Sequence, residues 1–340
     1  MVNKVIFILP YFGELPNYFP LWLNSAKYNF SYDFLFITDT DIDKYDLPNN
    51  VKYKKTTFDQ LVIRVKSCFP FPVSISSHYK ICDYKPAYGL IFNDEIRGYS
   101  HWGYCDIDLT LGNLNHFINE EMLVSGEKIG IFAHLIILPN TKKINNLMLQ
   151  DDIWPVDIHK ALISSKLFNL AEAGGINQVF SRNNWQQRAL PIADIIYDDA
   201  VVRSRVCKAL YQIHYYHCDK TFCLYMDTVG EKQVEREIAY IHYQKRKMAL
   251  DNNLDYAQPI IYQQNIVTNF QLEDSYGILK TTEDSELRRR LHGYKRKALA
   301  ATGYVIGFSK YDIRSKRRQS IQNIKDHNMS SYAFYSTLNN

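Results

Sequence analysis

The sequence lacks any apolar stretch long enough to cross a membrane. Its longest apolar runs, residues 5–10 and 129–138, fall well short of the roughly 18 to 20 residues that span a bilayer. The first four residues lead directly into a strand-like run, without the basic start, long apolar stretch and cleavage site of a signal peptide. We therefore expect a cytoplasmic protein.

Paired cysteines are also missing. The six cysteines are scattered and contain no Cys-x-x-Cys pair. This pattern predicts reduced thiols and argues against a zinc site.

Several common catalytic motifs are absent. The chain has no Gly-x-Gly-x-x-Gly pattern and no phosphate-binding loop, which leaves nicotinamide dehydrogenase and P-loop ATPase functions without support. It has no Gly-x-Ser-x-Gly elbow either, which weakens the case for a serine hydrolase.

What the chain does contain is typical of a folded protein. Among 340 residues, 46% are hydrophobic and 22% charged, so a disordered or collagen-like chain is excluded. Twenty-six tyrosines and eighteen phenylalanines favour a β-rich interior.

Strand and helix patterns alternate over the first 250 residues. Residues 5–9 and 33–38 have the composition of buried parallel strands, and apolar residues recur at helical spacing over residues 17–28. This order is that of a βαβ unit, and its continuation predicts an α/β domain with a mixed sheet.

The later elements follow the same pattern. Further strands are predicted at residues 102–108, 129–138 and 192–197, and helices at residues 85–92 and 175–180. Residues 222–226 and 238–243 flank a turn at Gly230, so we expect them to pair. From Asp251 the composition turns polar and then basic. We therefore expect one α/β domain over residues 1–250 and a mainly helical basic extension over residues 251–340.

Positive charge is concentrated in this extension. Residues 286–318 contain eleven Lys or Arg and two acids, a net charge of +9, against +4 for the whole chain. Such a segment suggests an anionic partner, either a membrane surface with acidic lipid or a nucleic acid. Apolar residues at helical spacing, Leu287, Leu291, Tyr294 and Ala298, predict a helix with a cationic outer face.

The sharpest candidate site is Asp106-Ile107-Asp108, at the end of a short apolar strand. Residues i and i+2 of a strand share a face, so the two carboxylates converge where the strand leaves the sheet. Like charges this close favour a cation between them. An Asp-x-Asp pattern also fits a solvated loop, but open α/β sheets bind ligands at the ends of parallel strands.

A second candidate is His242, which precedes Lys245, Arg246 and Lys247. An imidazole ahead of three cations suits a metal ligand followed by groups that neutralise a diphosphate. Taken alone, this local sequence favours a surface histidine beside a solvated basic run.

Four segments in order along the chain resemble a bacterial glycosyltransferase family encoded in capsule, exopolysaccharide and O-antigen clusters. They are residues 5–13, 80–89, 102–108 and 241–248. The layout is also similar to that of glycosyltransferase family 8, in which an Asp-x-Asp and a later histidine hold manganese on a nucleotide sugar. The resemblance implies a GT-A (Rossmann-like) fold, a mixed sheet flanked by helices, over residues 1–250.

The resemblance implies that Asp106 and Asp108 are the acidic metal ligands, with Asp108 part of the catalytic centre, and that His242 is the third ligand. Oxygen ligands with one imidazole favour Mn²⁺ over Mg²⁺. Lys245 and Lys247 would contact the donor diphosphate.

The resemblance also implies how the nucleotide sugar is bound. Lys85 would lie near the donor phosphate or sugar. Residues 10–12 (Pro10, Tyr11 and Phe12) would border the base and ribose, and Asp39 would accept a hydrogen bond from uracil. The implied donor is a UDP-sugar, UDP-galactose or UDP-glucose.

On the sugar and acceptor side the resemblance implies residues 133–135 and 172–177. An inverting reaction needs a carboxylate to take the acceptor proton, and Glu172 is the candidate, with Asp151 or Asp152 as competitors. A retaining reaction needs no such base, and the sequence leaves both courses open.

Together with these residues, the resemblance implies a metal-dependent hexosyltransferase that acts on a lipid-linked glycan acceptor in bacterial surface polysaccharide synthesis. The basic extension would touch an anionic membrane, and no nucleic-acid partner is expected. One alternative is a metal-dependent phosphoesterase, which uses two metals about 4 Å apart and more ligands. The other is a nucleic-acid-binding protein, which leaves the Asp pair without a purpose.

Overall fold

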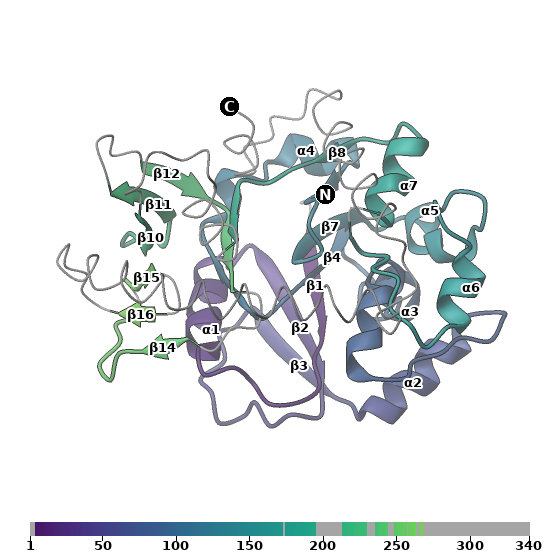
Figure 1. Cartoon of the computed structure of the whole chain (residues 1–340), viewed down its shortest axis with the longest axis horizontal. Coiled ribbons are helices and arrows are strands. Elements are labelled where there is room, and N and C mark those ends of the chain that lie inside the picture. Colours follow the sequence, from purple (N-terminus) through teal and green to yellow (C-terminus); the bar gives the residue numbers. More distant parts are fainter. Residues whose placement is uncertain are drawn as a thin grey trace, which may run out of the picture.

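A seven-stranded mixed sheet with helices on both faces forms the centre of the molecule (Figure 1). The computed structural model describes residues 4–172, 174–194, 213–229, 235–243, 248–256, 258–262 and 265–267. The strand order is β3-β2-β1-β4-β7-β6-β8. The strands are β1 (Val5–Pro10), β2 (Tyr32–Thr38), β3 (Val51–Lys55), β4 (His101–Cys105), β6 (Lys128–Ile129), β7 (Leu135–Pro139) and β8 (Gln187–Arg188). The predicted α/β class with a mixed sheet is confirmed.

Four neighbouring strands, β3, β2, β1 and β4, run parallel, and β7 runs antiparallel to β4. Val5 pairs with Tyr32 on one side and with His101 on the other. The two parallel strands predicted near the N-terminus are therefore confirmed. Their carboxyl ends, and that of β4, meet at one edge of the sheet, where open α/β sheets bind ligands.

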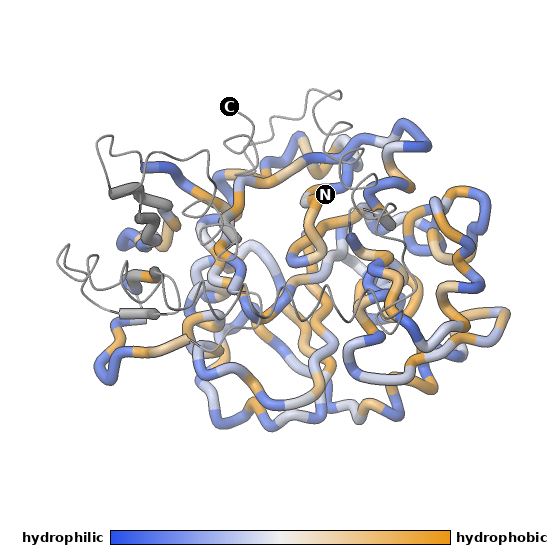
Figure 2. The backbone as a smooth tube through the Cα atoms, in the orientation of Figure 1, coloured by the Kyte–Doolittle hydropathy of each residue, from blue (hydrophilic) through white to orange (hydrophobic). Residues whose placement is uncertain are grey.

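The two faces of β1 enter different cores, because side chains alternate along a strand. Ile6 and Ile8 face the cluster that contains Leu61 and Val65, whereas Phe7 faces the cluster that contains Trp22. Figure 2 shows hydrophobic residues along the central strands and hydrophilic residues in the outer loops.

Helices cover both faces (Figure 1). The α-helices are α1 (Phe19–Tyr28), α2 (Phe58–Ser67), α3 (Tyr88–Ile91), α4 (Glu120–Ser125), α5 (Lys142–Asn145), α6 (Ile158–Ile163) and α7 (Ile176–Arg182). The 3₁₀ helices are η1 (His78–Ala87), η2 (Leu114–His116) and η3 (Leu147–Leu149). The helices predicted near residues 17–28 and 175–180 are confirmed as α1 and α7.

Local sequence accounts for where two of these helices begin. α1 has Pro20 in its first turn, where no intrahelical amide is needed. α2 begins at a capping box, in which the Thr57 side chain accepts from the Gln60 amide and the Gln60 side chain accepts from the Thr57 amide. These contacts satisfy donors that a helix start otherwise leaves unpaired.

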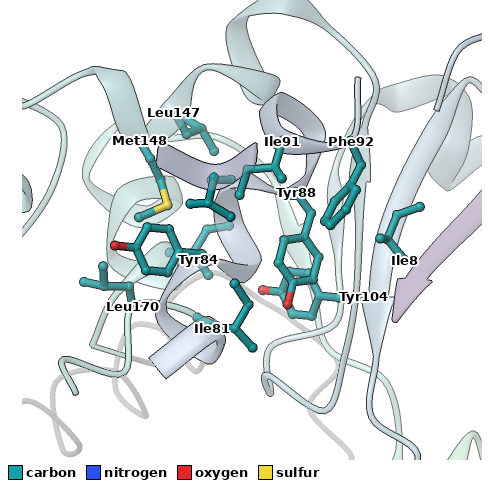
Figure 3. Close-up of a cluster of buried hydrophobic side chains, with 14 of the residues drawn as sticks. Ile8, Ile81, Tyr84, Tyr88, Ile91, Phe92, Tyr104, Leu147, Met148 and Leu170 are labelled. Carbon is teal, nitrogen blue, oxygen red and sulfur yellow. The ribbon is translucent and has the colours of Figure 1, made fainter. Parts of the chain in front are cut away.

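The larger core lies on both sides of the helical segment formed by η1 and α3, beside the sheet (Figure 3). Tyr88 lies on the side toward the sheet and Tyr84 and Met148 on the other side, and all three are fully buried. The ring of Tyr88 meets that of Tyr104 edge-on, with the centroids 6.1 Å apart. This core therefore supports β4 directly beneath the end that carries Asp106.

Two further sheets complete the described chain. A three-stranded sheet has the order β5-β13-β9, and a six-stranded sheet has the order β12-β11-β10-β15-β16-β14. The first consists of β5 (Leu109–Leu111), β13 (Tyr240–His242) and β9 (Ile192–Asp194). The second consists of β10 (Ile213–Cys218), β11 (Leu224–Val229), β12 (Glu235–Ile238), β14 (Ala249–Leu250), β15 (Ile260–Tyr262) and β16 (Asn265–Val267). Because β15 pairs with β10, this sheet contains strands from both sides of the boundary expected at residue 250. The division into two domains there stays a prediction. The basic segment at residues 286–318 lies outside the described residues.

The single strand predicted over residues 129–138 is wrong. β6 ends at Ile129 and β7 begins at Leu135, and the two pair antiparallel. Gly130 has a φ of +91°, and a Cβ there would lie 2.2 Å from the carbonyl oxygen of Leu135. Only glycine fits at this reversal of the chain.

Three other expectations are correct only in part. The helix predicted over residues 85–92 is α-helical only in α3, because η1 precedes it and Pro86 lacks the amide hydrogen of an α-helical bond. Leu224 of β11 pairs with Ile238 of β12 as expected, but residues 240–242 cross into the other sheet as β13. β9 forms the start of the strand predicted over residues 192–197, and residues 195–197 lie outside the described part.

Among the described residues, no helix has both the length and the apolar character that a bilayer crossing requires. Five cysteines in this part of the chain are free thiols: Cys68, Cys82, Cys105, Cys218 and Cys223.

Candidate functional site

The end of β4 carries the two aspartates. The Asp106 amide donates to the His134 carbonyl at 2.8 Å, and its carbonyl accepts from the Trp22 indole at 3.2 Å. Its carboxylate is 31% exposed, whereas that of Asp108 is 7% exposed. The backbone between β4 and β5 is therefore fixed, with one carboxylate accessible and one buried.

His242 reaches this strand end from far along the chain. β13 pairs antiparallel with β5, so that His242 lies opposite Leu109, the residue after Asp108. The His242 Nε2 is 3.3 Å from Asp108 Oδ2, and the potential ligand atoms of Asp106, Asp108 and His242 lie within 4.8 Å of one another. We call these three residues the Asp cluster.

Lys85 of η1 lies against the accessible carboxylate. Its Nζ donates to Asp106 Oδ1 at 2.6 Å and to the Ala133 carbonyl at 2.9 Å. Burial lowers the pKa of a lysine, but the Asp106 charge and hydrogen bond outweigh that effect and raise the pKa of Lys85. Lys85 is therefore a positive charge held beside the Asp cluster.

His134 is the neighbour that the sequence did not single out by itself. Its ring stacks on that of His242, with the centroids 3.6 Å apart, and on that of Phe132. Burial and the nearby His242 hold the pKa of His134 well below its usual range, so the ring is neutral at pH 7. The feature of the sequence that could have pointed to it is a titratable residue within the otherwise apolar run 129–138, just before β7.

The residues expected at the nucleotide end lie on neighbouring strand ends. Pro10 ends β1, and the exposed Asp39 follows β2, its neighbour in the sheet. Burial and then the charge of Asp108 raise the pKa of Tyr11, which places its hydroxyl within electrostatic reach of the Asp cluster. Phe12 instead packs in the core, with its ring 5.4 Å from that of Phe58.

A pocket of about 50 Å³ joins this end to the Asp cluster and is lined by Pro10, Tyr11, Lys85 and Asp106, among others. Tyr104 forms part of its wall, and its hydroxyl is buried without a hydrogen-bond partner among the described atoms. The strand prediction over residues 102–108 included this tyrosine but did not reveal that its hydroxyl lines a pocket.

The candidate base, Glu172, is exposed in the turn before α7. Its charge contributes to the raised pKa of both Lys85 and Tyr104, which places the carboxylate near this pocket. Among the competitors, Asp151 pairs with His159 at 3.1 Å, and Asp152 is exposed beside it. Glu172 is thus the candidate that the electrostatics link to the Asp cluster.

The remaining expected residues divide into two groups. Ala133 contacts Lys85 through its carbonyl, whereas the Asn177 side-chain amide donates to the carbonyl of Ile131, two residues before Ala133, at 2.7 Å. Lys245 and Lys247 lie outside the described residues.

The donor set fits a divalent cation. Two carboxylates and one imidazole converge on one point, and their hard oxygens with a single nitrogen suit Mn²⁺ or Mg²⁺. A cation there, with Lys85 alongside, would present two positive charges to an anionic group in the pocket.

Solved glycosyltransferases are similar to this chain at low identity. The galactosyltransferase LgtC in complex with donor and acceptor sugar analogues is 12% identical with a TM-score of 0.34, over 71% of this chain and 87% of that chain. An active-site variant of LgtC is 9% identical with a TM-score of 0.35, over 72% of this chain and 88% of that chain. Mouse xyloside xylosyltransferase 1 is 9% identical with a TM-score of 0.37, over 72% of this chain and 98% of that chain.

No curated protein matches the sequence. One family model, described as a family of unknown function (DUF6625), matches residues 7–271. Because this match spans more than half of the 340 residues, the chain belongs to the DUF6625 family.

Proposed function

We propose that this protein is a metal-dependent glycosyltransferase that moves a hexose from a UDP-sugar to a glycan acceptor. The observation that carries the proposal is the convergence of Asp106, Asp108 and His242 at the carboxyl edge of the sheet, beside Lys85. The resemblance of four sequence segments to bacterial polysaccharide glycosyltransferases supports the same activity.

The chemistry follows from the charges. Breaking the bond between sugar and diphosphate develops negative charge on the leaving diphosphate, and a bound divalent cation supplies Lewis-acid stabilisation there. Lys85 keeps its proton and adds positive charge where that negative charge develops. Asp108 Oδ2 lies 3.3 Å from the Nε2 of His242, so the carboxylate and the imidazole of these two expected ligands face the same point.

For an inverting course, Glu172 would accept the proton of the acceptor hydroxyl as the new glycosidic bond forms. Its exposure keeps the carboxylate accessible to an acceptor. A retaining course needs no base, so a Glu172→Gln variant distinguishes the two: it loses transfer in the first case and keeps it in the second.

The direct test is UDP release from UDP-galactose and UDP-glucose with Mn²⁺, with the Asp106→Asn variant as the matched control. We expect release from the unmodified chain and almost none from the variant. Thermal stabilisation by UDP, GDP and CMP, each with Mn²⁺, then tests which nucleotide the donor site prefers. Stabilisation by GDP or CMP but not by UDP would contradict the uridine donor, and equal release by both chains would overturn the metal site.

The acceptor and its location belong to the same proposal. We propose a lipid-linked glycan acceptor at the cytoplasmic face of a bacterial membrane, in capsule, exopolysaccharide or O-antigen synthesis. The eleven basic residues of segment 286–318 would bind acidic lipid, at about 1 kcal/mol each near the surface.

The membrane contact has its own test. Vesicles with acidic lipid should sediment the full chain at low salt and release it near 0.5 M salt, where the Debye length is about 4 Å. Replacing Arg288, Arg289 and Arg290 by Gln should weaken sedimentation and leave UDP release intact. Equal sedimentation of both proteins would remove the membrane from the proposal.

A further inference from the structure

A second group of possible metal ligands lies where the six-stranded sheet meets the rest of the chain. His116 ends η2, Cys223 immediately precedes β11, and Glu237 belongs to β12, which pairs with β11 (Figure 1). One ligand atom of each residue lies within 4.8 Å of the others. We call these residues the Cys cluster.

The distances argue against a proton relay and for a shared ligand. His116 Nδ1 is 2.7 Å from Glu237 Oε1 and 3.8 Å from Cys223 Sγ. A catalytic Cys-His-acid relay uses both ring nitrogens, one for the thiol and one for the acid. Here the same nitrogen meets both partners, so the three donor atoms converge on one point, as they do around a metal.

A short loop holds Cys223 in place. The Asp219 carboxylate accepts from the amides of Thr221 at 2.8 Å and of Cys223 at 2.9 Å. Phe222 has a φ of +60° and is buried, with its ring stacked on that of Tyr28 of α1 at 4.9 Å. The sulfur is therefore positioned by the fold before any ligand binds.

Polar groups already surround the sulfur. Thr221 Oγ1 lies 3.3 Å from Cys223 Sγ, and the Asn113 amide donates toward it at 3.9 Å. Donors of this kind support a thiolate ligand from outside the coordination sphere. Cys223 is 3% exposed, whereas the side chains of His116 and Glu237 are 49% and 25% exposed, so the site is open to water on the histidine and glutamate side.

We propose that His116, Cys223 and Glu237 form a zinc site that links the six-stranded sheet to the α/β core. One sulfur, one nitrogen and one oxygen suit Zn²⁺, and water completes a tetrahedral set. Zinc lies about 2.3 Å from sulfur and about 2.0 Å from nitrogen in such sites, so the present spacing needs only small side-chain movements. The cysteine pattern alone argued against a zinc site, because these ligands come from three separate segments without a Cys-x-x-Cys pair.

The test uses Co²⁺ as the probe, because a thiolate ligand adds a sulfur-to-cobalt charge-transfer band that oxygen and nitrogen ligands do not. Titration of the full chain with Co²⁺ should produce this band at one equivalent, and added Zn²⁺ should remove it. The Cys223→Ser variant should lack the band, and Cys68→Ser, a change at a half-buried cysteine outside the cluster, should keep it. Absence of the band in the unmodified chain, or its persistence in Cys223→Ser, overturns the proposal.

A stability measurement guards against a variant that does not fold. Zn²⁺ should raise the melting temperature of the unmodified chain and of Cys68→Ser, but not that of His116→Ala, a change at a largely exposed side chain. An equal rise in His116→Ala also overturns the proposal. Neither readout uses sugar transfer, and an Asp106→Asn/Asp108→Asn variant should keep the cobalt band.

Discussion

The Asp cluster and the Cys cluster offer a metal very different surroundings. The first lies at the edge of the central sheet, has a buried carboxylate and imidazole, and is accompanied by Lys85 and His134. The second lies where the six-stranded sheet meets η2, has an exposed histidine, and has the neutral groups of Asn113 and Thr221 near its sulfur. A charged lysine that can meet an anionic ligand therefore accompanies the Asp cluster.

This difference separates a reactive role from a structural one. A positive charge beside a metal favours an anionic substrate, whereas a thiolate with hydrogen-bond donors around it stabilises a resident ion. Substitutions in the Asp cluster should therefore affect sugar transfer, and substitutions in the Cys cluster should affect the response to Zn²⁺.

Asp106→Asn and Asp108→Asn should each lower UDP release by about 10³-fold, because each removes a ligand charge at the point where the leaving group is stabilised. The melting temperature should change little for Asp106→Asn, whose side chain is partly exposed at a strand end. Steady-state rates and thermal unfolding measure the two effects.

Cys223→Ser is the opposite case: its transfer rate should stay unchanged while its response to Zn²⁺ disappears. If Cys223→Ser lost transfer as fully as Asp106→Asn, the contrast between the clusters would fail.

Lys85→Met should lower UDP release by about 100-fold, because it removes a preorganised positive charge from the anionic end of the donor. The effect should appear in the maximal rate as well as in UDP binding measured by calorimetry. Lys142→Met, at an exposed lysine of α5, is the matched control and should behave as the unmodified chain does. A Lys85→Met enzyme with the full maximal rate would show that the lysine only holds Asp106 in place.

Much of the Asp cluster followed from local sequence, and the reason is geometric. The apolar composition of residues 5–9 and 33–38 predicted two parallel strands, and the period of a strand put Asp106 and Asp108 together at a strand end. Both inferences need only a few consecutive residues.

The rest depends on contacts between distant segments. β12 pairs with β11 in the six-stranded sheet, but β13, which follows it directly, pairs with β5 in the three-stranded sheet and so brings His242 to the cluster. No local pattern at residues 238–243 reveals this change of sheet. The stacking of His134 on His242 needs the reversal at Gly130, which interrupts a run that looks like one continuous strand. The Cys cluster combines three such distant segments, so nothing in its local sequence marks it.

His134→Ala should raise the Mn²⁺ concentration needed for half-maximal activity by about tenfold, since groups that hold a metal ligand from outside typically contribute 10- to 100-fold. The physical reason is the ring stack at 3.6 Å, which restrains the rotation of His242. His134→Phe keeps an aromatic ring at this position and should stay within a few fold of the unmodified chain. Equal defects in the two variants would show that the imidazole itself, and not the stack, is required.

The last prediction separates two buried lysines by their surroundings. Lys128 of β6 is fully buried and Lys85 is 8% exposed, but the Lys128 Nζ donates to the Gly130 carbonyl at 2.6 Å and no carboxylate raises its pKa, so burial lowers the pKa of Lys128 to about 7. In the unfolded chain a lysine binds its proton up to about pH 10.4. Between about pH 7 and pH 10 the unfolded state therefore binds more protons than the folded state at this site, and the free energy of unfolding rises with pH by up to about 1.4 kcal/mol per unit.

Lys128→Met should remove this contribution. Urea unfolding at a series of pH values should then give a flatter dependence of the unfolding free energy on pH than in the unmodified chain. Lys142→Met should leave that dependence unchanged. If the free energy of unfolding of Lys128→Met followed the same pH dependence as that of the unmodified chain, the buried Lys128 would keep its proton without a counter-charge. Asp106 could then no longer explain why Lys85 stays charged.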